Sequence, residues 1–260
     1  MTDRLIADLE RLSTIAPELA VNAAIAASGA ADGYVTRPSP VGTLYVAFTG
    51  RGVSAVELAD SPQDFEETFA NLHGRPALPV AHMPRQIERH LDNAIATGKP
   101  GRLPLDFGGL TAFQQAVLEK TAEIPTGEVR PYGWIAKEIG KPGAVRAVGS
   151  ALAKNPIPVV VPCHRVVRSD GKLGNYSLGD PSNKRVLLEA EGLDLNTYES
   201  LADRGIRFTG SDTTKIFCNP SCGPAVRTMA EHRVEFRSES DAREHGYRPC
   251  KVCRPVTIAA

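Results

Sequence analysis

The chain has 260 residues, of which 42% are hydrophobic and 23% are charged, the composition of a globular protein. At this length two or three compact units are expected rather than one. No stretch is apolar for long enough to span a bilayer, and the N-terminus lacks the uninterrupted apolar core of a secretory signal. We therefore expect a chain that makes no membrane contact and a cytoplasmic location.

The formal net charge is zero, but the charges are unevenly distributed. Residues 1–111 carry 9 basic and 13 acidic side chains, whereas residues 112–192 carry 11 and 8 and residues 203–260 carry 10 and 7. The positive excess coincides with the motifs described below. It is small, so it permits contact with nucleic-acid phosphates without proving it.

The first half of the chain predicts helices around a small sheet. Leu5, Leu9, Leu12 and Ile15 recur at helical spacing, so one or two helices are expected over residues 2–30. β-rich runs broken by turn residues predict an antiparallel sheet over 33–59. Helices are expected over 62–73 and 84–97, before a linker rich in glycine and proline.

From Thr111, which can cap a helix, the chain becomes helical. Two short helices are expected at Tyr132–Ile139 and Ala144–Lys154, joined by a glycine-containing turn, which is a helix-turn-helix pattern. In the second helix small residues surround Arg146. Taken alone, the pattern fits an ordinary helical hairpin with an exposed arginine at least as well as a DNA-binding element.

A lone cysteine, Cys163, follows a run of valines for which a short buried strand or extended segment is expected. A thiol with its ordinary pKa of about 8.5 needs activation, and His164 is a base next to it. Neighbouring strand residues point to opposite faces, so the two can cooperate only in an irregular segment or through a water. A carboxylate should orient the histidine, and Glu191 is a candidate. The alternative from these residues alone is a structural thiol beside a surface histidine.

The wider sequence resembles a known family. Over residues 33–192, and most strongly over 112–192, the chain is similar to the O6-alkylguanine-DNA alkyltransferases, with the specific strings PCHRV at 162–166 and GNYS at 174–177. The resemblance implies an α+β fold. It would consist of a small ribonuclease-H-like N-terminal β-sheet domain, 33–108, and a helical, winged-helix-like catalytic domain, 109–195. Residues 1–32 would then form an N-terminal helical extension.

The resemblance also implies roles for individual residues. Cys163 would be the alkyl acceptor, His164 its water-mediated base and Glu191 the carboxylate behind that base. Tyr132 would donate a proton to the guanine and Asn155 would shape the site. The remaining positions implied are Arg146, Ala144, Gly149 and Ser150 for DNA binding, with Arg146 filling the space of the flipped base, and Tyr176 and Ser177 for the alkyl pocket.

This chemistry predicts the partner and the cofactor requirement. The substrate would be O6-alkylguanine, and also O4-alkylthymine, in double-stranded DNA, from which the nucleotide must be extruded. The thioether product cannot be cleaved, so each molecule, expected to be a monomer, would act once without an organic cofactor. A lesion sensor without transfer and a cysteine-histidine hydrolase are the alternatives. The combination of Cys163, His164 and Glu191 favours transfer.

Four further cysteines form two close pairs in the last 43 residues, Cys218 with Cys222 and Cys250 with Cys253. Two such pairs can supply the four-sulfur shell that zinc favours. About 50 residues hold little core, so a structural metal would be needed. We expect one zinc in a small C-terminal α+β domain, 203–256, and a catalytic part that keeps its activity without it. No cysteine precedes Cys163, so no zinc is expected in the N-terminal domain.

The C-terminal segment resembles the zinc domain of Ada, the bacterial adaptive-response protein. There the first cysteine takes methyl groups from DNA methylphosphotriesters, and that residue would be Cys218 here. Ada is basic just after its second cysteine, whereas this chain reads Gly223-Pro224-Ala225. The transcriptional DNA-binding module of Ada is also missing. The resemblance therefore predicts zinc binding and DNA contact, with a second transfer that is slow or absent.

Overall fold

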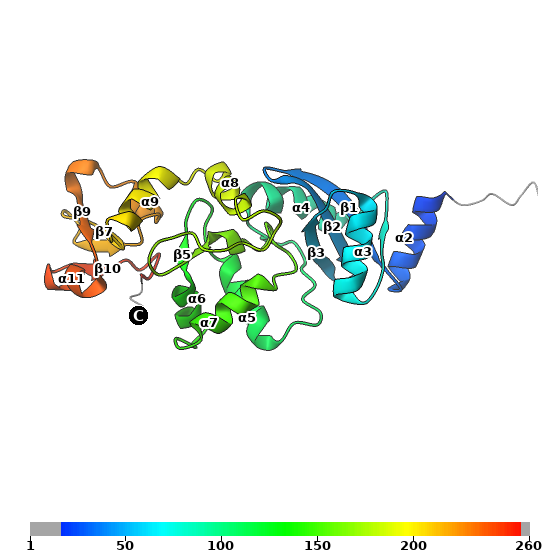
Figure 1. Cartoon of the computed structure of the whole chain (residues 1–260), viewed down its shortest axis with the longest axis horizontal. Helices are drawn as coiled ribbons and strands as arrows, with labels where there is room; N and C mark the ends of the chain where they lie inside the picture. The colour runs from blue at the N-terminus through cyan, green and yellow to red at the C-terminus, as the bar shows by residue number, and fades with distance from the viewer. Residues whose placement is uncertain (1–16, 256–260) are drawn as a thin grey trace, which may run out of the picture.

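The computed structural model describes residues 17–255, which form an elongated molecule with its terminal parts at opposite ends (Figure 1). Leu5, Leu9, Leu12 and Ile15, whose spacing predicted a helix, all lie outside the described residues. Helix α2, Glu18–Ser28, matches the rest of that prediction. It is held to the neighbouring sheet by Asn22, whose side-chain amide donates to the Pro79 carbonyl at 3.0 Å.

A four-stranded sheet forms the N-terminal part, in the order β3-β2-β1-β4. Its strands are β1 (Asp32–Ser39), β2 (Gly42–Thr49), β3 (Gly52–Leu58) and β4 (Ala77–Pro79). The first three are antiparallel, which confirms the predicted sheet. The short β4 pairs in parallel with β1 and was not predicted, because three residues give no readable alternation.

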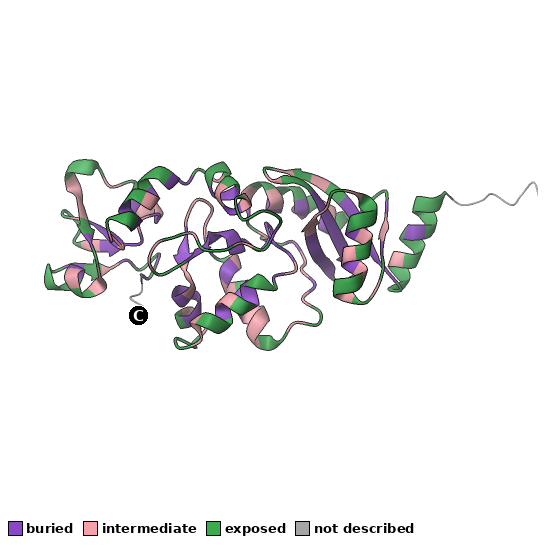
Figure 2. Cartoon of the chain, in the orientation of Figure 1, coloured by how far each residue is buried: buried purple, intermediate pink, exposed green. Residues whose placement is uncertain are grey.

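Two helices accompany this sheet, α3 (Pro62–His73) and α4 (Arg85–Thr97), close to their predicted bounds. Alternate strand residues face opposite sides. Tyr34 and Tyr45 therefore pack with Phe65 of α3, whereas Val46 joins a larger core with Leu91 of α4. That larger core continues into the helical part of the chain and joins the two parts. Figure 2 shows buried residues in both parts.

The helical part contains the predicted helix-turn-helix. It comprises α5 (Ala112–Ala122), α6 (Tyr132–Glu138) and α7 (Val145–Ala153). Thr111 caps α5 as predicted, with Gln114 completing a reciprocal capping box. Val148 and Leu152 of α7 are buried, so the opposite face of that helix is left for solvent.

The segment before Cys163 differs from the prediction. It is buried, as expected, but Val159–Val161 is neither a strand nor extended. Pro158 and Val161 bridge across a tight turn in which Val159 has a φ of 69°, the left-handed region. The Asn155 side chain sets this turn, because it donates to the Val161 carbonyl and accepts from the Ile157 amide, each at 3.0 Å.

After this turn the chain forms a 3-10 turn, Cys163–Arg165, and strand β6 (Val166–Val167), which pairs in parallel with β5 (Arg130–Pro131). Helix α8 (Asn183–Ala190) matches the predicted last helix of the helical part. The next helix, α9 (Leu195–Asp203), was not predicted. Its Leu195 and Tyr198 pack into a small core with Val167.

The C-terminal part is a second small sheet, in the order β10-β8-β7-β9. Its elements are β7 (Phe208–Ser211), β8 (Ile216–Cys218), α10 (Gly223–Val226), β9 (Arg233–Phe236), α11 (Glu239–Glu244) and β10 (Arg248–Pro249). The chain as described is therefore a mixed α+β protein. Among the described residues no helix is both long and apolar enough to cross a membrane.

Candidate active site and metal centre

Cys163 begins the 3-10 turn between α7 and β6 and is only 6% exposed. The Asn155 amide that holds the preceding turn also donates to the thiol sulfur at 3.2 Å. One side chain therefore fixes both the backbone before the cysteine and the sulfur itself. A 3-10 turn is the irregular segment that a cysteine and an adjacent histidine need in order to cooperate.

Burial raises the pKa of the Cys163 thiol, so the resting group is protonated. The hydrogen bond from Asn155 and the positive charge of Lys184 oppose that shift. Both stabilise a thiolate once it forms. The site is thus arranged to support a transient thiolate while keeping the resting thiol unreactive toward solvent.

His164, Arg165 and Glu191 form one buried network behind the cysteine. His164 Nε2 lies 2.7 Å from Glu191 Oε1. The Arg165 guanidinium, fully buried, donates to both oxygens of the same carboxylate, with Nη2 2.6 Å from Oε1. The Gly127 amide donates to Glu191 Oε2 at 3.1 Å. Glu191 thus contacts His164, while its orienting role stays a prediction, and Arg165 is a partner that was not predicted.

The network fixes the protonation of its members. Burial alone would raise the pKa of Glu191, but hydrogen bonds from His164 and Arg165 lower that pKa to about 2. Burial lowers the pKa of His164, although Glu191 opposes the shift. The imidazole is therefore neutral near neutral pH. Its Nδ1 is buried and makes no hydrogen bond to the described residues, so it is the ring nitrogen left to take a proton.

Lys184 is a further buried charge that sequence reasoning missed. Only 1% of it is exposed, and its ammonium donates to the carbonyls of Val166, at 2.6 Å, and Leu173, at 2.5 Å. Burial lowers its pKa to about 8, although the Cys163 thiolate opposes that shift. A lysine in a helix sequence is typical of a solvated face, so the burial of Lys184 beside the site could not be predicted.

Two tyrosines approach the thiol from different elements. Tyr132 begins α6 and is half-buried; burial and then the charge of Cys163 raise its pKa. Burial and the charge of Cys163 also raise the pKa of Tyr176, whose ring meets that of His164 edge-on at 6.3 Å. Ser177 is exposed and lines a hollow of about 890 Å³ together with Asn155. Tyr176 therefore lies beside Cys163, whereas Ser177 shares a hollow with Asn155.

The residues predicted to contact DNA lie together on α7. Arg146 and Ser150 are exposed one turn apart, and Ala144 is the residue that precedes the helix. Gly149 lies on the same helix, where an added Cβ would come within 3.9 Å of the Tyr132 ring. The arginine thus lies on an exposed face with small residues, and Gly149 of the same helix lies next to the Tyr132 ring.

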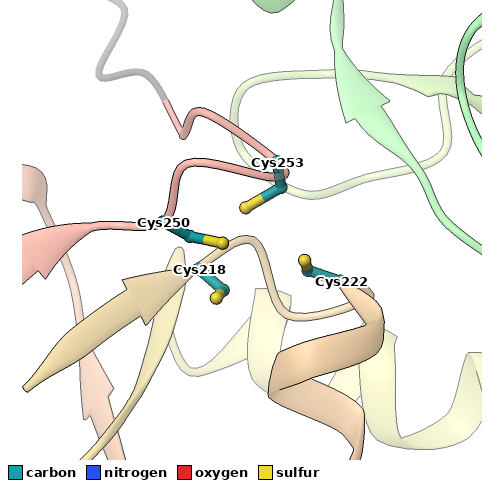
Figure 3. Close-up of side chains that lie close together, drawn as sticks. All are labelled: Cys218, Cys222, Cys250 and Cys253. Atoms are coloured by element: carbon teal, nitrogen blue, oxygen red, sulfur yellow. The ribbon is translucent and has the colours of Figure 1, made fainter. Parts of the chain in front are cut away.

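The four C-terminal cysteines converge, although they come from three elements (Figure 3). Cys218 ends β8, Cys222 precedes α10, and Cys250 and Cys253 follow β10. Their sulfur atoms all lie within 4.8 Å of one another, and none is in a disulfide. Four thiols at this spacing can reach one zinc ion with Zn–S bonds of about 2.3 Å. The donor set fits the predicted structural zinc.

Comparison with known proteins agrees with this geometry. Residues 112–193 match the family described as 6-O-methylguanine DNA methyltransferase, DNA binding domain, and residues 200–256 match the metal binding domain of Ada. A methylated-DNA–protein-cysteine methyltransferase of Mycobacterium leprae is 46% identical over 168 residues, which are 64% of this chain and 95% of that protein. The chain belongs to the methylated-DNA–protein-cysteine methyltransferase family.

A further relative and a solved structure show which part of the chain is shared with known proteins. The bifunctional transcriptional activator/DNA repair enzyme Ada of Escherichia coli is 39% identical over 162 residues, but this methyltransferase-family chain matches only 45% of Ada's length. The similarity to the crystal structure of Mycobacterium tuberculosis OGT in complex with DNA covers 62% of the present chain and 93% of the OGT chain, with 37% identity and a TM-score of 0.50. The shared region is the alkyltransferase fold, and the chain combines it with an Ada-type metal-binding domain.

Proposed function

We propose that this chain repairs DNA by transferring the alkyl group of O6-alkylguanine irreversibly onto Cys163. The observation that carries the proposal is the buried thiol held by Asn155 in the same turn as His164, which is backed by Glu191. Relatives that share this region are named methylated-DNA–protein-cysteine methyltransferases, and one was solved with DNA. O4-alkylthymine presents the same kind of alkyl carbon and is included in the proposed substrate range.

The proposed reaction is a displacement at the alkyl carbon. The S–C bond to Cys163 forms as the C–O6 bond of guanine breaks. The thiol proton passes through a water to His164 Nδ1, and Glu191 stabilises the imidazolium that results. Tyr132 donates a proton to the departing guanine, whose negative charge would otherwise build up. Tyr176 and Ser177 line the pocket for the alkyl group. The thioether product is stable, so that protein molecule is inactive afterwards.

Extrusion of the lesion is assigned to α7. A base inside a duplex hides its O6 substituent, so the nucleotide must leave the stack. Arg146, exposed among small side chains, fills the space that the base leaves, while Ala144, Gly149 and Ser150 let the helix approach the DNA closely. We propose double-stranded DNA as the partner and a monomer as the active form. The cytoplasmic location stays a prediction.

The finer fold belongs to the same proposal. Residues 33–108 form a ribonuclease-H-like β-sheet domain, and residues 109–195 form a winged-helix-like catalytic domain that presents α7. Residues 1–32 extend the first unit, and 203–256 form the zinc unit. Zinc would be held by Cys218, Cys222, Cys250 and Cys253, and when bound it would keep these thiols deprotonated and the small domain folded.

Substitution of the acceptor tests the proposal. Cys163→Ser should abolish removal of the methyl group from an O6-methylguanine duplex while leaving binding to that duplex unchanged. A wild-type chain that binds the duplex and never demethylates it would instead support a lesion sensor. Release of methanol with continued turnover would support a hydrolase.

A second function is favoured by one observation at the metal centre. Cys218 and Cys250, 4% and 5% exposed, line a hollow of about 350 Å³, whereas Cys222 and Cys253 are fully buried. Arg248 and Lys251 line the same hollow and could hold a phosphate group. These charges partly replace the basic residues missing at 223–225. We propose that Cys218 takes a methyl group from methylphosphotriesters there.

The Cys163→Ala protein separates this second transfer from the first. Methylphosphotriester DNA should add one methyl group to Cys218, at a rate below that of transfer to Cys163. Mass spectrometry of the peptides locates the methyl group. Full retention of unmodified Cys218 over long incubation would leave the four cysteines with a structural role alone.

A further inference from the structure

The C-terminal part docks on the helical part through buried hydrogen bonds to a single short segment. Ser221, between the first two cysteines of the metal centre, accepts from the Val129 amide at 2.9 Å and donates to the Val129 carbonyl at 3.3 Å. The Gly223 amide, just after Cys222, donates to Glu128 at 2.8 Å. The loop between two metal-site cysteines is thus hydrogen-bonded to residues 128–129.

A third contact joins the other cysteine pair to the same region. Trp134 Nε1 donates to the Cys253 carbonyl at 2.9 Å, and the indole is 4% exposed. The guanidinium groups of Arg130 and Arg254 each lie 5.8 Å from the Trp134 ring centroid, which favours a cation–π contact from both sides of the interface. The peptide of a metal-site cysteine is therefore bound by a side chain of α6.

The segment that receives these contacts also supports the acceptor site. Arg130 of β5 pairs with Val166 of β6, immediately after the Cys163–Arg165 turn. The Gly127 amide donates to Glu191, one residue before Glu128. Trp134 lies on α6, which begins with Tyr132. Residues 127–134 therefore touch the metal centre on one side and three parts of the proposed alkyl-transfer site on the other.

We propose that the four-cysteine domain is a positioning element for alkyl transfer at Cys163. Without the metal centre, the Val129 amide and the Trp134 indole would lose their buried partners, and residues 127–134 would move to find others. Tyr132, Glu191 and the β5–β6 pair would move with them. This inference rests on the proposed function of Cys163, and it replaces the sequence-based expectation that the helical part keeps full activity without the zinc domain.

Removal of zinc from the full-length protein by a chelator is the first test. Trp134 is the single tryptophan of the chain, so its fluorescence reports the interface directly. Its emission should move to longer wavelength as the indole gains solvent. The single-turnover rate of methyl transfer to Cys163 should fall roughly tenfold, because small misplacements of reacting groups are costly. If neither the emission wavelength of Trp134 nor the rate of methyl transfer changes on zinc removal, the proposal is overturned.

Two serine variants provide a second test without removing the metal. Ser221→Ala deletes both hydrogen bonds to Val129, and Ser240→Ala deletes an exposed hydroxyl of α11 that is hydrogen-bonded to Ser238. Faster hydrogen exchange of the Val129 amide and slower transfer are expected for Ser221→Ala alone. Zinc content is measured in parallel. If Ser221→Ala also loses zinc, the variant is equivalent to the zinc-free protein, for which the same slow transfer is expected.

The pH profile distinguishes positioning from simple loss of folded protein. Movement of residues 127–128 weakens the Gly127 bond to Glu191, so the pH dependence of transfer should change in Ser221→Ala. A variant that only unfolds more would lower the active fraction and leave the profile of the remainder unchanged, which would contradict the proposal. Wild-type protein that never methylates Cys163 would overturn the proposed function itself, whatever the variants do.

Discussion

Burial opposes the charged forms of both Cys163 and His164, as the directions of their pKa shifts record. Glu191 keeps its charge because His164 and Arg165 bind it, which holds its pKa at about 2. In the proposed mechanism, the thiolate therefore forms only as its proton leaves for a neutral histidine backed by a fixed anion. Such an arrangement suits a protein that uses its nucleophile once, since it protects the thiol until a lesion arrives.

Glu191→Gln should slow transfer to Cys163 by on the order of a hundredfold, because the imidazolium would lose its counter-charge. The substitution should also change the acid stability of the protein. The pKa of Glu191 is lowered from 4.5 to about 2 on folding, so its contribution to stability is complete above pH 4.5 and is lost as pH falls toward 2. That contribution is on the order of 3 kcal/mol.

Glu189→Gln is the matched control for both measurements. Glu189 is exposed, lies two residues earlier on α8 and pairs only with Arg185 among the described residues. Single-turnover assays and urea unfolding at pH 5.5 and pH 3 should show little effect of that change. Equal behaviour of the two variants would remove Glu191 from the proposed base system.

At the scale of elements, the end of α4 holds Arg165 in place. Gly98, which ends α4, has a φ of +56°, and a Cβ there would collide with the Arg165 guanidinium. Gly98→Ala should destabilise the protein by about 3–5 kcal/mol, since it adds backbone strain and displaces the buried partner of Glu191. Unfolding by urea measures the loss.

Gly101→Ala supplies a closely matched control for that prediction. Its φ is +55°, but an added Cβ would find only the Lys99 carbonyl, at 3.9 Å. Backbone strain alone should cost about 1–2 kcal/mol. If the two alanine variants lose the same stability, the contact between α4 and Arg165 contributes nothing.

Helix α7 carries a prediction about extrusion of the lesion. Arg146→Ala should slow repair of O6-methylguanine in a duplex about tenfold or more, yet leave transfer from the free base almost unchanged, because unstacking costs a few kcal/mol only in the duplex. Lys137→Ala, which removes an exposed charge from α6, is the control for charge alone. Equal losses on duplex and free base would assign Arg146 to folding or to the chemistry instead.

The elements that the sequence predicted are those with strong local signals. The Thr111 cap, the bounds of α3 and the exposed face around Arg146 follow from periodicity and capping chemistry. The turn at Val159 could not be predicted, because a run of valines favours a strand and only the distant Asn155 side chain imposes the turn. Local preference gives way to tertiary contacts there.

The candidate site shows the same division between local and long-range information. Cys163, His164 and Glu191 were predicted from residue type and resemblance, and the structure brings all three together. Arg165 and Lys184 were not predicted as members, because a buried cation shows itself only through partners remote in sequence. Helix α9 was not predicted for a related reason, because its packing against Val167, which is remote in sequence, is what reveals it.

For the whole molecule, the converging sulfur atoms predict one zinc per chain. Cys250→Ser should release the metal and unfold residues from about 208 onward, because binding and folding are coupled in so small a domain. Elemental analysis and limited proteolysis of the purified protein measure the two effects. Cys163→Ser is the control and should keep its zinc, so metal loss from both variants, or near-absence of metal from the wild type, would contradict the assignment.

The central claim concerns the fate of the alkyl group, and intact-mass measurement after incubation with excess O6-methylguanine duplex tests it most directly. We predict that each molecule gains one methyl group, that peptide mapping places it on Cys163, and that repaired guanines equal methylated protein. Sustained repair beyond one equivalent, or a methyl group that persists in the Cys163→Ala protein with the same DNA, would contradict the claim.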